Sequence, residues 1–220
     1  MYNKHDYSVL KSLFQIFESS EIRKVLATLQ VHSPFTLIDI GCGFDLRYVG
    51  YVLFALARNN ITDVVVHIVD PALHGDSTHL AKENIKKAFP KAKFNVYPEQ
   101  WNPKKLIPLE AGQLHLAVAI QTTPLFDDLE CSKIHADIVN LLINNGIFLD
   151  ISEIKDRVTD RDTYPDLQLY SRSTEQRIKI ACDCGFRVLT STELPAHAIG
   201  EPDDQVMVGL LLSKSNEWLK

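Results

Sequence analysis

An apolar segment that ends in a glycine turn constrains this sequence more than any other feature. Residues 34–45 read PFTLIDIGCGFD: an apolar run over 35–40, then Gly41 and Gly43, then Asp45 at the start of a stretch with helical periodicity. Strand, glycine turn and helix in this order open the nucleotide-binding units of α/β proteins. Glycine lacks Cβ, so the turn can take positive φ and a ligand can approach the backbone. The helix that follows offers free N–H groups and the positive end of its dipole.

Apolar runs and helical stretches alternate along the rest of the chain. The expected strands are residues 35–40, 64–70, 94–97, 114–121, 147–151, 186–190 and 205–212. The expected helices are residues 45–58, 76–89, 128–144 and 173–184, after a helical stretch over 6–30. This alternation predicts a doubly wound, mostly parallel seven-stranded α/β sheet with helices on both faces. The last two strands are joined by a loop too short for a crossover helix, so they should be antiparallel neighbours.

Length and composition predict one globular domain over residues 1–220. The hydrophobic fraction is 45%, enough for a buried core, and the net charge of −5 argues against binding driven by neutralisation of nucleic-acid phosphates. The N-terminus does not have the pattern of a leader, and no apolar stretch has the length of a membrane span. Four cysteines without a CxxC pair favour reduced thiols and no metal site. We therefore expect a cytoplasmic protein without membrane contact.

A carboxylate stands at the end of the second apolar run. Residues 64–70 read VVVHIVD, a continuous β-branched run typical of a parallel strand buried on both faces. Ligands of such sheets bind outside the carboxyl ends of the strands, where Asp70 lies. A carboxylate can accept two hydrogen bonds from a cis-diol. The alternative interpretation is an acid that only ends a strand.

Three classes of ligand use a strand, a glycine turn and a helix. A P-loop needs GxxxxGK followed by Ser or Thr, and no stretch matches it. A dinucleotide fold needs GxGxxG, whose third glycine lets helix and strand pack closely. Leu46 stands at that third position, which weighs against a dinucleotide and against a nicotinamide-dependent oxidoreductase. The third class is S-adenosylmethionine (SAM).

The chain resembles the class I SAM-dependent methyltransferases over roughly residues 35–213. LIDIGCG is similar to the family's first motif, an acid followed by GxG, and Asp70 stands where the family places an acid that holds both ribose hydroxyls. GIFLDI resembles the fifth strand, and STEQRIKIACDCGFRVL resembles the last helix with the sixth strand. The finish with two strands and no helix between them fits the same family. The resemblance implies a Rossmann-like domain with SAM as cofactor.

The resemblance places the cofactor at several strand ends. It implies that Asp39 lies near the cofactor's ammonium and that Glu99 and Gln100 are the candidates to receive the adenine amine. Trp101 can pack on the adenine face. Asp39, buried alone, would be costly, so it should have a partner. The full expected cofactor set is Asp39, Gly41, Cys42, Gly43, Asp70, Pro71, Glu99, Gln100, Trp101, Ile120 and Gln121.

One position in the glycine turn departs from the family pattern. The family often has a third glycine after GxG, and this chain has Asp45 there. A carboxylate at that point either caps the following helix or repels the cofactor's own carboxylate, and Arg47 is close enough in sequence to offset it. The sequence leaves these alternatives open.

The acceptor side carries no motif that names a substrate. Adenine and glutamine amine methylases have two prolines and an aromatic residue after strand four, where this chain reads QTTP. Ribose-methylating enzymes have an Asp at about this point, where this chain has Gln121. The lysines over residues 86–93 and at positions 104 and 105 are interpreted as a solvated helix face and loop, so RNA is not favoured as a substrate. The acids Asp127, Asp128, Asp150 and Glu153 have the wrong spacing for the metal-dependent enzymes, so we interpret them as solvated or capping acids. No catalytic residue is assigned.

Three segments are expected to surround the acceptor. They are the N-terminal helical segment 1–33, the residues after strand four, and a polar insert over 152–172. In the resembling family such an N-terminal segment often folds over the cofactor as a lid, and Tyr2, His5 and Tyr7 lie in it here.

The leading hypothesis is a SAM-dependent methyltransferase acting on a small molecule or a protein. Catalysis would rest on proximity and orientation, because the sulfonium is already a strong electrophile. The alternatives are a protein of the same fold that binds or regulates without turnover, and an RNA methyltransferase. The oligomeric state and the identity of the acceptor stay open.

Overall fold

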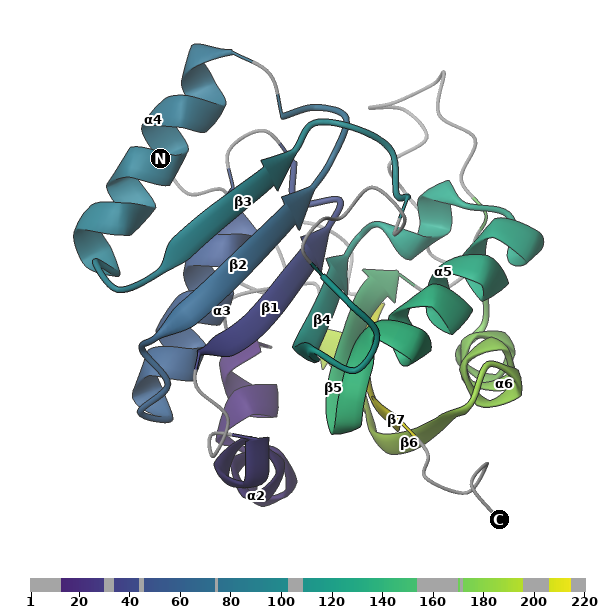
Figure 1. The fold of residues 1–220 in the computed structure, drawn as a ribbon. Helices are drawn as coiled ribbons and strands as arrows, with labels where there is room; N and C mark the ends of the chain where they lie inside the picture. The colour runs from purple at the N-terminus through teal and green to yellow at the C-terminus, as the bar shows by residue number, and fades with distance from the viewer. Residues whose placement is uncertain are drawn as a thin grey trace.

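The computed structural model describes residues 13–29, 34–43, 46–73, 75–102, 109–153, 170, 172–195 and 206–214. These residues form one seven-stranded sheet covered by helices on both faces (Figure 1). The strands are β1 (Phe35–Ile40), β2 (Val64–Val69), β3 (Lys93–Tyr97), β4 (Leu114–Ile120), β5 (Leu142–Glu153), β6 (Phe186–Pro195) and β7 (Val206–Lys214). The helices are α2 (Ser20–Leu29), α3 (Arg47–Arg58), α4 (Asp76–Ala88), the 3-10 helix η2 (Thr123–Leu125), α5 (Asp128–Leu141) and α6 (Thr174–Asp183).

The strand order is β3-β2-β1-β4-β5-β7-β6. Strands β1 to β5 pair in parallel, whereas β7 runs antiparallel to both β5 and β6. This confirms the predicted mostly parallel sheet and its antiparallel finish. After β1 the chain adds β2 and β3 on one side of this strand, and then crosses back to add β4 on its other side. The crevice outside the carboxyl ends of β1 and β4 is therefore a topological switch point, where ligands of such sheets bind.

Two hydrophobic cores, one on each face, hold the helices to the sheet. On one face, Leu37 of β1 and Val66 of β2 belong to the same core as Leu53 of α3 and the buried residues of α2. On the other face, Ala117 and Phe148 share a core with buried residues of α5 and α6. The period-two alternation of strand side chains therefore sorts each strand residue to one core or the other.

Most sequence-predicted boundaries agree with the structure within two residues, but the end of α5, the start of β5 and the end of β6 do not. Strand β6 was expected to end at residue 190 and reaches Pro195. The helix expected to reach residue 144 ends at Leu141, because Leu142 already pairs with Leu114, and residues 143–146 bulge out before pairing resumes at Ile147. Asn145 therefore takes its positive φ of 62° in a strand bulge and not at a helix end. In α4, the helical pattern predicts an inward-facing Leu80, but this side chain is 62% exposed.

The N-terminal helical segment packs beside the far end of α3. The Asn59 amide donates to the Phe17 carbonyl, and Glu18 forms an ion pair with Arg58. These contacts hold residues 13–29 at the end of α3 remote from the glycine turn. Residues 1–12, with Tyr2, His5 and Tyr7, lie outside the described residues, so a lid over the site stays a prediction. Among the described residues, no helix is long and apolar enough to cross a membrane.

Candidate functional site

A cavity of about 290 Å³ opens at the carboxyl ends of β1 and β2. Its lining combines the turn after β1, the residues after β2, the segment after β3 and the loop after β4. The lining residues are Ile40, Gly41, Val69, Asp70, Pro71, Glu99, Gln100, Trp101, Thr122, Leu125 and Phe126. Four separate strand ends thus meet at one hollow beside the switch point of the sheet.

Asp70 ties the glycine turn to the end of β2. One carboxylate oxygen accepts from the Gly43 N–H at 2.8 Å, and the other accepts from the Ala72 N–H at 2.7 Å. The Gly41 N–H donates to the Val69 carbonyl at 2.8 Å, which holds the two strand ends together. A carboxylate has about four acceptor positions, so these two bonds leave capacity on Asp70 for a ligand's hydroxyls.

Thr122 fills the crevice between the ends of β1 and β4. Its hydroxyl is 2.8 Å from the Ile40 carbonyl, to which it donates, and 3.1 Å from the Ile120 carbonyl. A Cβ placed on Gly41 would lie 2.3 Å from the Thr122 Oγ1 and 2.4 Å from its Cγ2. Gly41 also has φ +74°, so both space and backbone require glycine there.

Two non-glycine residues beside the crevice adopt left-handed backbone. Leu46, just before α3, has φ 53°, and Gln121, just after β4, has φ 58°. Such conformations cost on the order of 1–3 kcal/mol and persist where the surrounding packing enforces them. Leu46 is fully buried, which supplies that packing. Two of the four described non-glycine residues with positive φ therefore lie beside this crevice, whereas Asn60 and Asn145 lie elsewhere.

Asp39 is a buried acid one position before the last residue of β1. It is 1% exposed, and neither carboxylate oxygen has a hydrogen-bond partner among the described residues. Burial, with a smaller contribution from the charge of Asp70, raises the pKa of Asp39 to about 8. The described part of the chain therefore does not supply the partner expected from the sequence. Leu37 and Asp39 point to the same face by alternation, which puts this carboxyl on the α3 side of the sheet.

Trp101 lines the cavity from the segment after β3. Its indole N–H donates to the Asp137 carboxylate of α5 at 3.2 Å, and its ring packs against the core on the α5 side. The indole N–H thus has a partner on α5, and the same residue lines the cavity. The expectation that Trp101 belongs to the site rested on its position after the third strand.

The structure separates the predicted site residues into two groups. Six of them line the cavity: Gly41, Asp70, Pro71, Glu99, Gln100 and Trp101. The other five, Asp39, Cys42, Gly43, Ile120 and Gln121, are not part of its lining. Gly43 reaches it through Asp70, and Ile120 belongs to the core on the α3 side, where alternation places it. Asp45 lies outside the described residues, so its effect on the turn stays open.

Sequence reasoning missed three lining residues from the loop after β4: Thr122, Leu125 and Phe126. The position of QTTP directly after the fourth strand could have indicated them. This stretch was compared only with the acceptor motifs of known methylases. Behind this loop, the Thr123 hydroxyl donates to Asp150 at 2.9 Å, and Asp150 forms a buried ion pair with Arg177 at 2.9 Å.

Three of the four acids considered for a metal have other roles, and the interpretation of Asp150 as a solvated or capping acid was wrong, because this side chain is 1% exposed. Asp127 is the N-cap of α5 in a capping box with Glu130, and Asp128 pairs with Arg172 at 2.8 Å. Asp150 is committed to Thr123 and Arg177. Within the described part of the chain, no three His, Cys, Asp or Glu residues gather as metal ligands.

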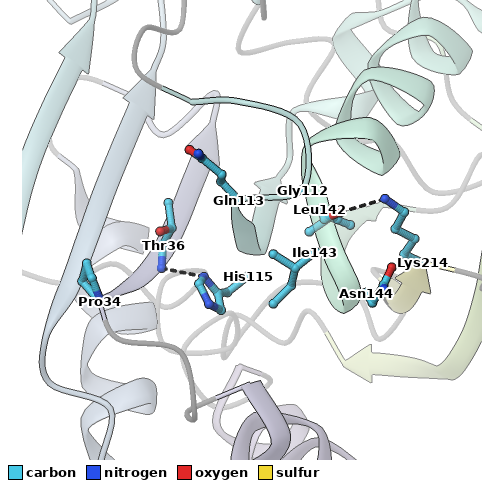
Figure 2. Close-up of a pocket in the computed structure, with 9 residues that line it drawn as sticks. All are labelled: Pro34, Thr36, Gly112, Gln113, His115, Leu142, Ile143, Asn144 and Lys214. Carbon is cyan, nitrogen blue, oxygen red and sulfur yellow. Dashed lines mark hydrogen bonds between the residues drawn. The ribbon is translucent and has the colours of Figure 1, made fainter.

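A second cavity, of about 630 Å³, lies at the opposite edge of the sheet, at the amino ends of β1, β4 and β5. Figure 2 shows His115 beside Thr36 and Lys214 beside Leu142 across this space. The His115 Nδ1 accepts from the Thr36 N–H at 3.0 Å, and the Lys214 ammonium donates to the Leu142 carbonyl at 2.9 Å. Both side chains therefore satisfy backbone groups at the beginnings of strands.

Comparisons with solved structures agree on the fold. The chain aligns with a SAM-dependent methyltransferase from Methanosarcina mazei at TM-score 0.57 and 14% identity, over 82% of this chain and 92% of that one. It aligns with geranyl diphosphate C-methyltransferase from Streptomyces coelicolor, solved with geranyl diphosphate and S-adenosyl-L-homocysteine, at TM-score 0.56 and 14% identity, over 90% and 83%.

The cyclase SpnF gives TM-score 0.57 and 17% identity, over 88% of this chain and 80% of that one. No protein-family model and no curated protein matches the sequence. The chain thus has the fold of class I SAM-dependent methyltransferases, and at these identities the likeness concerns the fold alone. Because the same fold carries a cyclase as well as methyltransferases, function has to be argued from the site.

Proposed function

We propose that this protein is a SAM-dependent methyltransferase that transfers a methyl group to a small-molecule or protein acceptor. The observation that carries the proposal is the junction of Asp70 with the glycine turn at the edge of a cavity walled by Trp101. A diol-binding carboxylate, an exposed backbone turn and an aromatic wall are the groups that a nucleoside needs. They meet at the switch point, where the fold binds its ligands.

The described residues fit two parts of the cofactor, its nucleoside and its ammonium group. The cavity, near the lower end of the roughly 300–1,000 Å³ of small-molecule pockets, suits the nucleoside half. Asp70 retains acceptor positions for the ribose hydroxyls, and Glu99, Gln100 and Trp101 surround the place for the base. Asp39 is a buried carboxyl without a partner among the described residues, and a ligand's ammonium would supply one. These roles are part of the proposal.

The protein's own contribution to methyl transfer would be binding, orientation and exclusion of water. Bound SAM supplies a methyl group on a positively charged sulfur, which is already activated for transfer. Asp70 and Trp101 would fix the nucleoside, and Gly41 would let the backbone lie against the rest of the cofactor. Leu125 and Phe126, on the loop after β4, would shield the reacting region from water. Proximity and orientation then provide most of the rate enhancement.

A second function, ligand binding without turnover, is favoured by one specific observation. Among the described lining residues, the ionisable side chains are Asp70 and Glu99, and neither His, Cys, Lys nor Tyr is present. Acceptors that must lose a proton in the reaction would find no neutral base in this part of the wall. Binding of S-adenosylhomocysteine without methyl transfer to any of a broad acceptor panel would support this alternative.

The test of the proposal is calorimetric titration with SAM and S-adenosylhomocysteine. Asp70→Ala should weaken binding by about 1.5–3 kcal/mol, because hydrogen bonds to a charged acceptor are lost. Asp70→Asn keeps one acceptor oxygen and should weaken it less, and Asp63→Ala, on an exposed acid before β2, is the matched control. Absence of binding by the wild-type protein at millimolar ligand would refute the proposal.

A further inference from the structure

The loop after β4 is held from outside by a short returning segment. The Tyr170 N–H donates to the Pro124 carbonyl at 2.7 Å. The Arg172 guanidinium donates from Nη1 to the Thr123 carbonyl at 3.2 Å and from Nη2 to the Phe126 carbonyl at 2.7 Å. Tyr170 and Arg172 thus bind three carbonyls of one loop. The Thr123 carbonyl also accepts from the Phe126 N–H at 3.3 Å within this turn, whereas the carbonyls of Pro124 and Phe126 receive their donors from the segment with Tyr170 and Arg172.

The side chain of Arg172 is buried and does not lie on the surface. Its side chain is 5% exposed, whereas its ion-pair partner Asp128 is 82% exposed. An ion pair with one exposed partner contributes little, so the buried carbonyl bonds are the main role of Arg172. The planar fork of donors in arginine can serve several acceptors at fixed angles, which lysine cannot do.

The loop that Arg172 holds is a wall of the candidate site. Thr122, one residue before η2, is seated against Gly41, and Leu125 and Phe126 line the cavity. The loop begins in left-handed backbone at residue 121, a conformation that surrounding contacts must maintain. We propose that Arg172 is a positioning residue for the cofactor cavity: it keeps the loop after β4 in the conformation in which this loop lines the cavity together with Asp70. The ligand-binding part of this inference rests on the proposed function.

A second anchor makes the effect of Arg172 separable from folding. Thr123 is also held through its hydroxyl by Asp150, which the buried Arg177 supports. If Arg172 is changed, the start of the loop keeps this anchor, whereas the end of the loop loses the bond to its carbonyl at position 126. The expected disturbance is local to the cavity wall.

The test compares Arg172→Lys with Asp128→Asn, which removes only the exposed ion pair. Amide hydrogen exchange is followed at Leu125 and Phe126, whose N–H groups donate to the carbonyls of residues 122 and 123. Dissociation constants for S-adenosylhomocysteine are measured by tryptophan fluorescence in a Trp218→Phe background, which leaves Trp101 as the only tryptophan. Arg172→Lys should speed exchange at both amides and weaken ligand binding by about tenfold each, as expected for the loss of hydrogen bonds from a charged donor, and Asp128→Asn should change each less than about twofold.

Each other outcome decides against one of the two proposals. Unchanged exchange at Leu125 and Phe126 would overturn the role of Arg172, as would an equal rise at Val66 and Ile68 in β2, because the change would then be global. Faster loop exchange with unchanged ligand affinity would also overturn it. If the wild-type protein binds no S-adenosylhomocysteine, the proposed function fails, while the exchange result still decides whether Arg172 positions the loop.

Discussion

The two cavities lie at opposite ends of the same strands, β1 and β4, and their polar groups are committed differently. At the amino end, the side chains of His115 and Lys214 satisfy backbone groups of the sheet. At the carboxyl end, Asp70 lines the cavity, accepts two backbone hydrogen bonds and retains acceptor capacity. Asp39, which is buried near the end of β1 and is not part of the cavity lining, has no hydrogen-bond partner among the described residues. The amino-end cavity is about 630 Å³ and the other about 290 Å³. The acceptor capacity left on the lining carboxylate Asp70, and not cavity size, is the reason why we propose the carboxyl-end cavity as the ligand site.

The two ends of the strands also differ in how closely they are packed, and a matched pair of glycines tests this difference with the largest expected effect. Gly41 and Gly112 border the two cavities and have nearly equal φ, +74° and +73°. Gly112→Ala should cost about 1–2 kcal/mol from left-handed strain alone, because its Cβ would meet nothing within 4 Å. Gly41→Ala should cost about 2–3 kcal/mol more, because its Cβ would collide with Thr122.

Urea unfolding of both variants measures the difference. Equal losses of stability would mean that Thr122 moves aside freely, and the close packing of the crevice would then have no energetic importance.

Asp39, the buried acid of β1, predicts that the free energy of unfolding depends on pH. The folded protein holds the proton of Asp39 up to about pH 8, whereas the unfolded chain loses it near its ordinary pKa of about 4. This group therefore stabilises the fold fully below about pH 4, and the contribution is lost as pH rises to 8. Asp39→Asn should remove a fall on the order of 2–4 kcal/mol between about pH 5 and pH 8.

Unfolding free energies of wild type and Asp39→Asn across this range provide the measurement. Asp63→Asn, which removes an exposed acid, should keep the wild-type slope. Parallel curves for wild type and Asp39→Asn would show that the carboxyl is not titrating in this window.

The smallest expected effect is at the amino end. Lys214→Met removes one hydrogen bond from a half-buried ammonium to the Leu142 carbonyl, so stability should fall by about 0.5–1.5 kcal/mol. Affinity for S-adenosylhomocysteine should not change. A weakened affinity, measured by the same titration as for Asp70→Ala, would make the amino-end cavity part of the ligand site and remove the contrast between the two ends.

The fold was predictable because its signals are local. Alternation of apolar runs and helical stretches predicts the parallel sheet, and capping residues such as Ser173 mark a helix start that the structure confirms. Leu80 shows the limit: spacing indicates which side of a helix is apolar, but burial also needs a neighbour to cover it, and Leu80 is 62% exposed. Only the tertiary packing decides that.

The site was predictable where it depends on strand ends and not where it depends on long-range contacts. Gly41, Asp70 and Trp101 were found from their positions after strands. Thr122 was missed because its role depends on the pairing of β4 with β1, and Arg172 because it acts across 46 to 49 positions of sequence.

Asp39 shows how a general rule can be met in an unexpected way. A buried charge needs a partner, and the sequence therefore predicted one for this carboxylate. The raised pKa of Asp39 means that this group holds its proton instead, so Asp39 itself carries no buried charge at neutral pH.

The place of β7 in the sheet has a consequence for how the molecule assembles. Strand β7 lies between β5 and β6 and pairs with both, although it is the last strand in the chain. The sheet beyond β5 therefore cannot grow in chain order, because β6 has its described pairing only with β7. Contacts between distant segments must overcome loop-closure entropy before they stabilise, and they form slowly. Until β7 pairs with β5, the outer edge of β5 is unpaired. Incompletely folded chains can associate through such an edge.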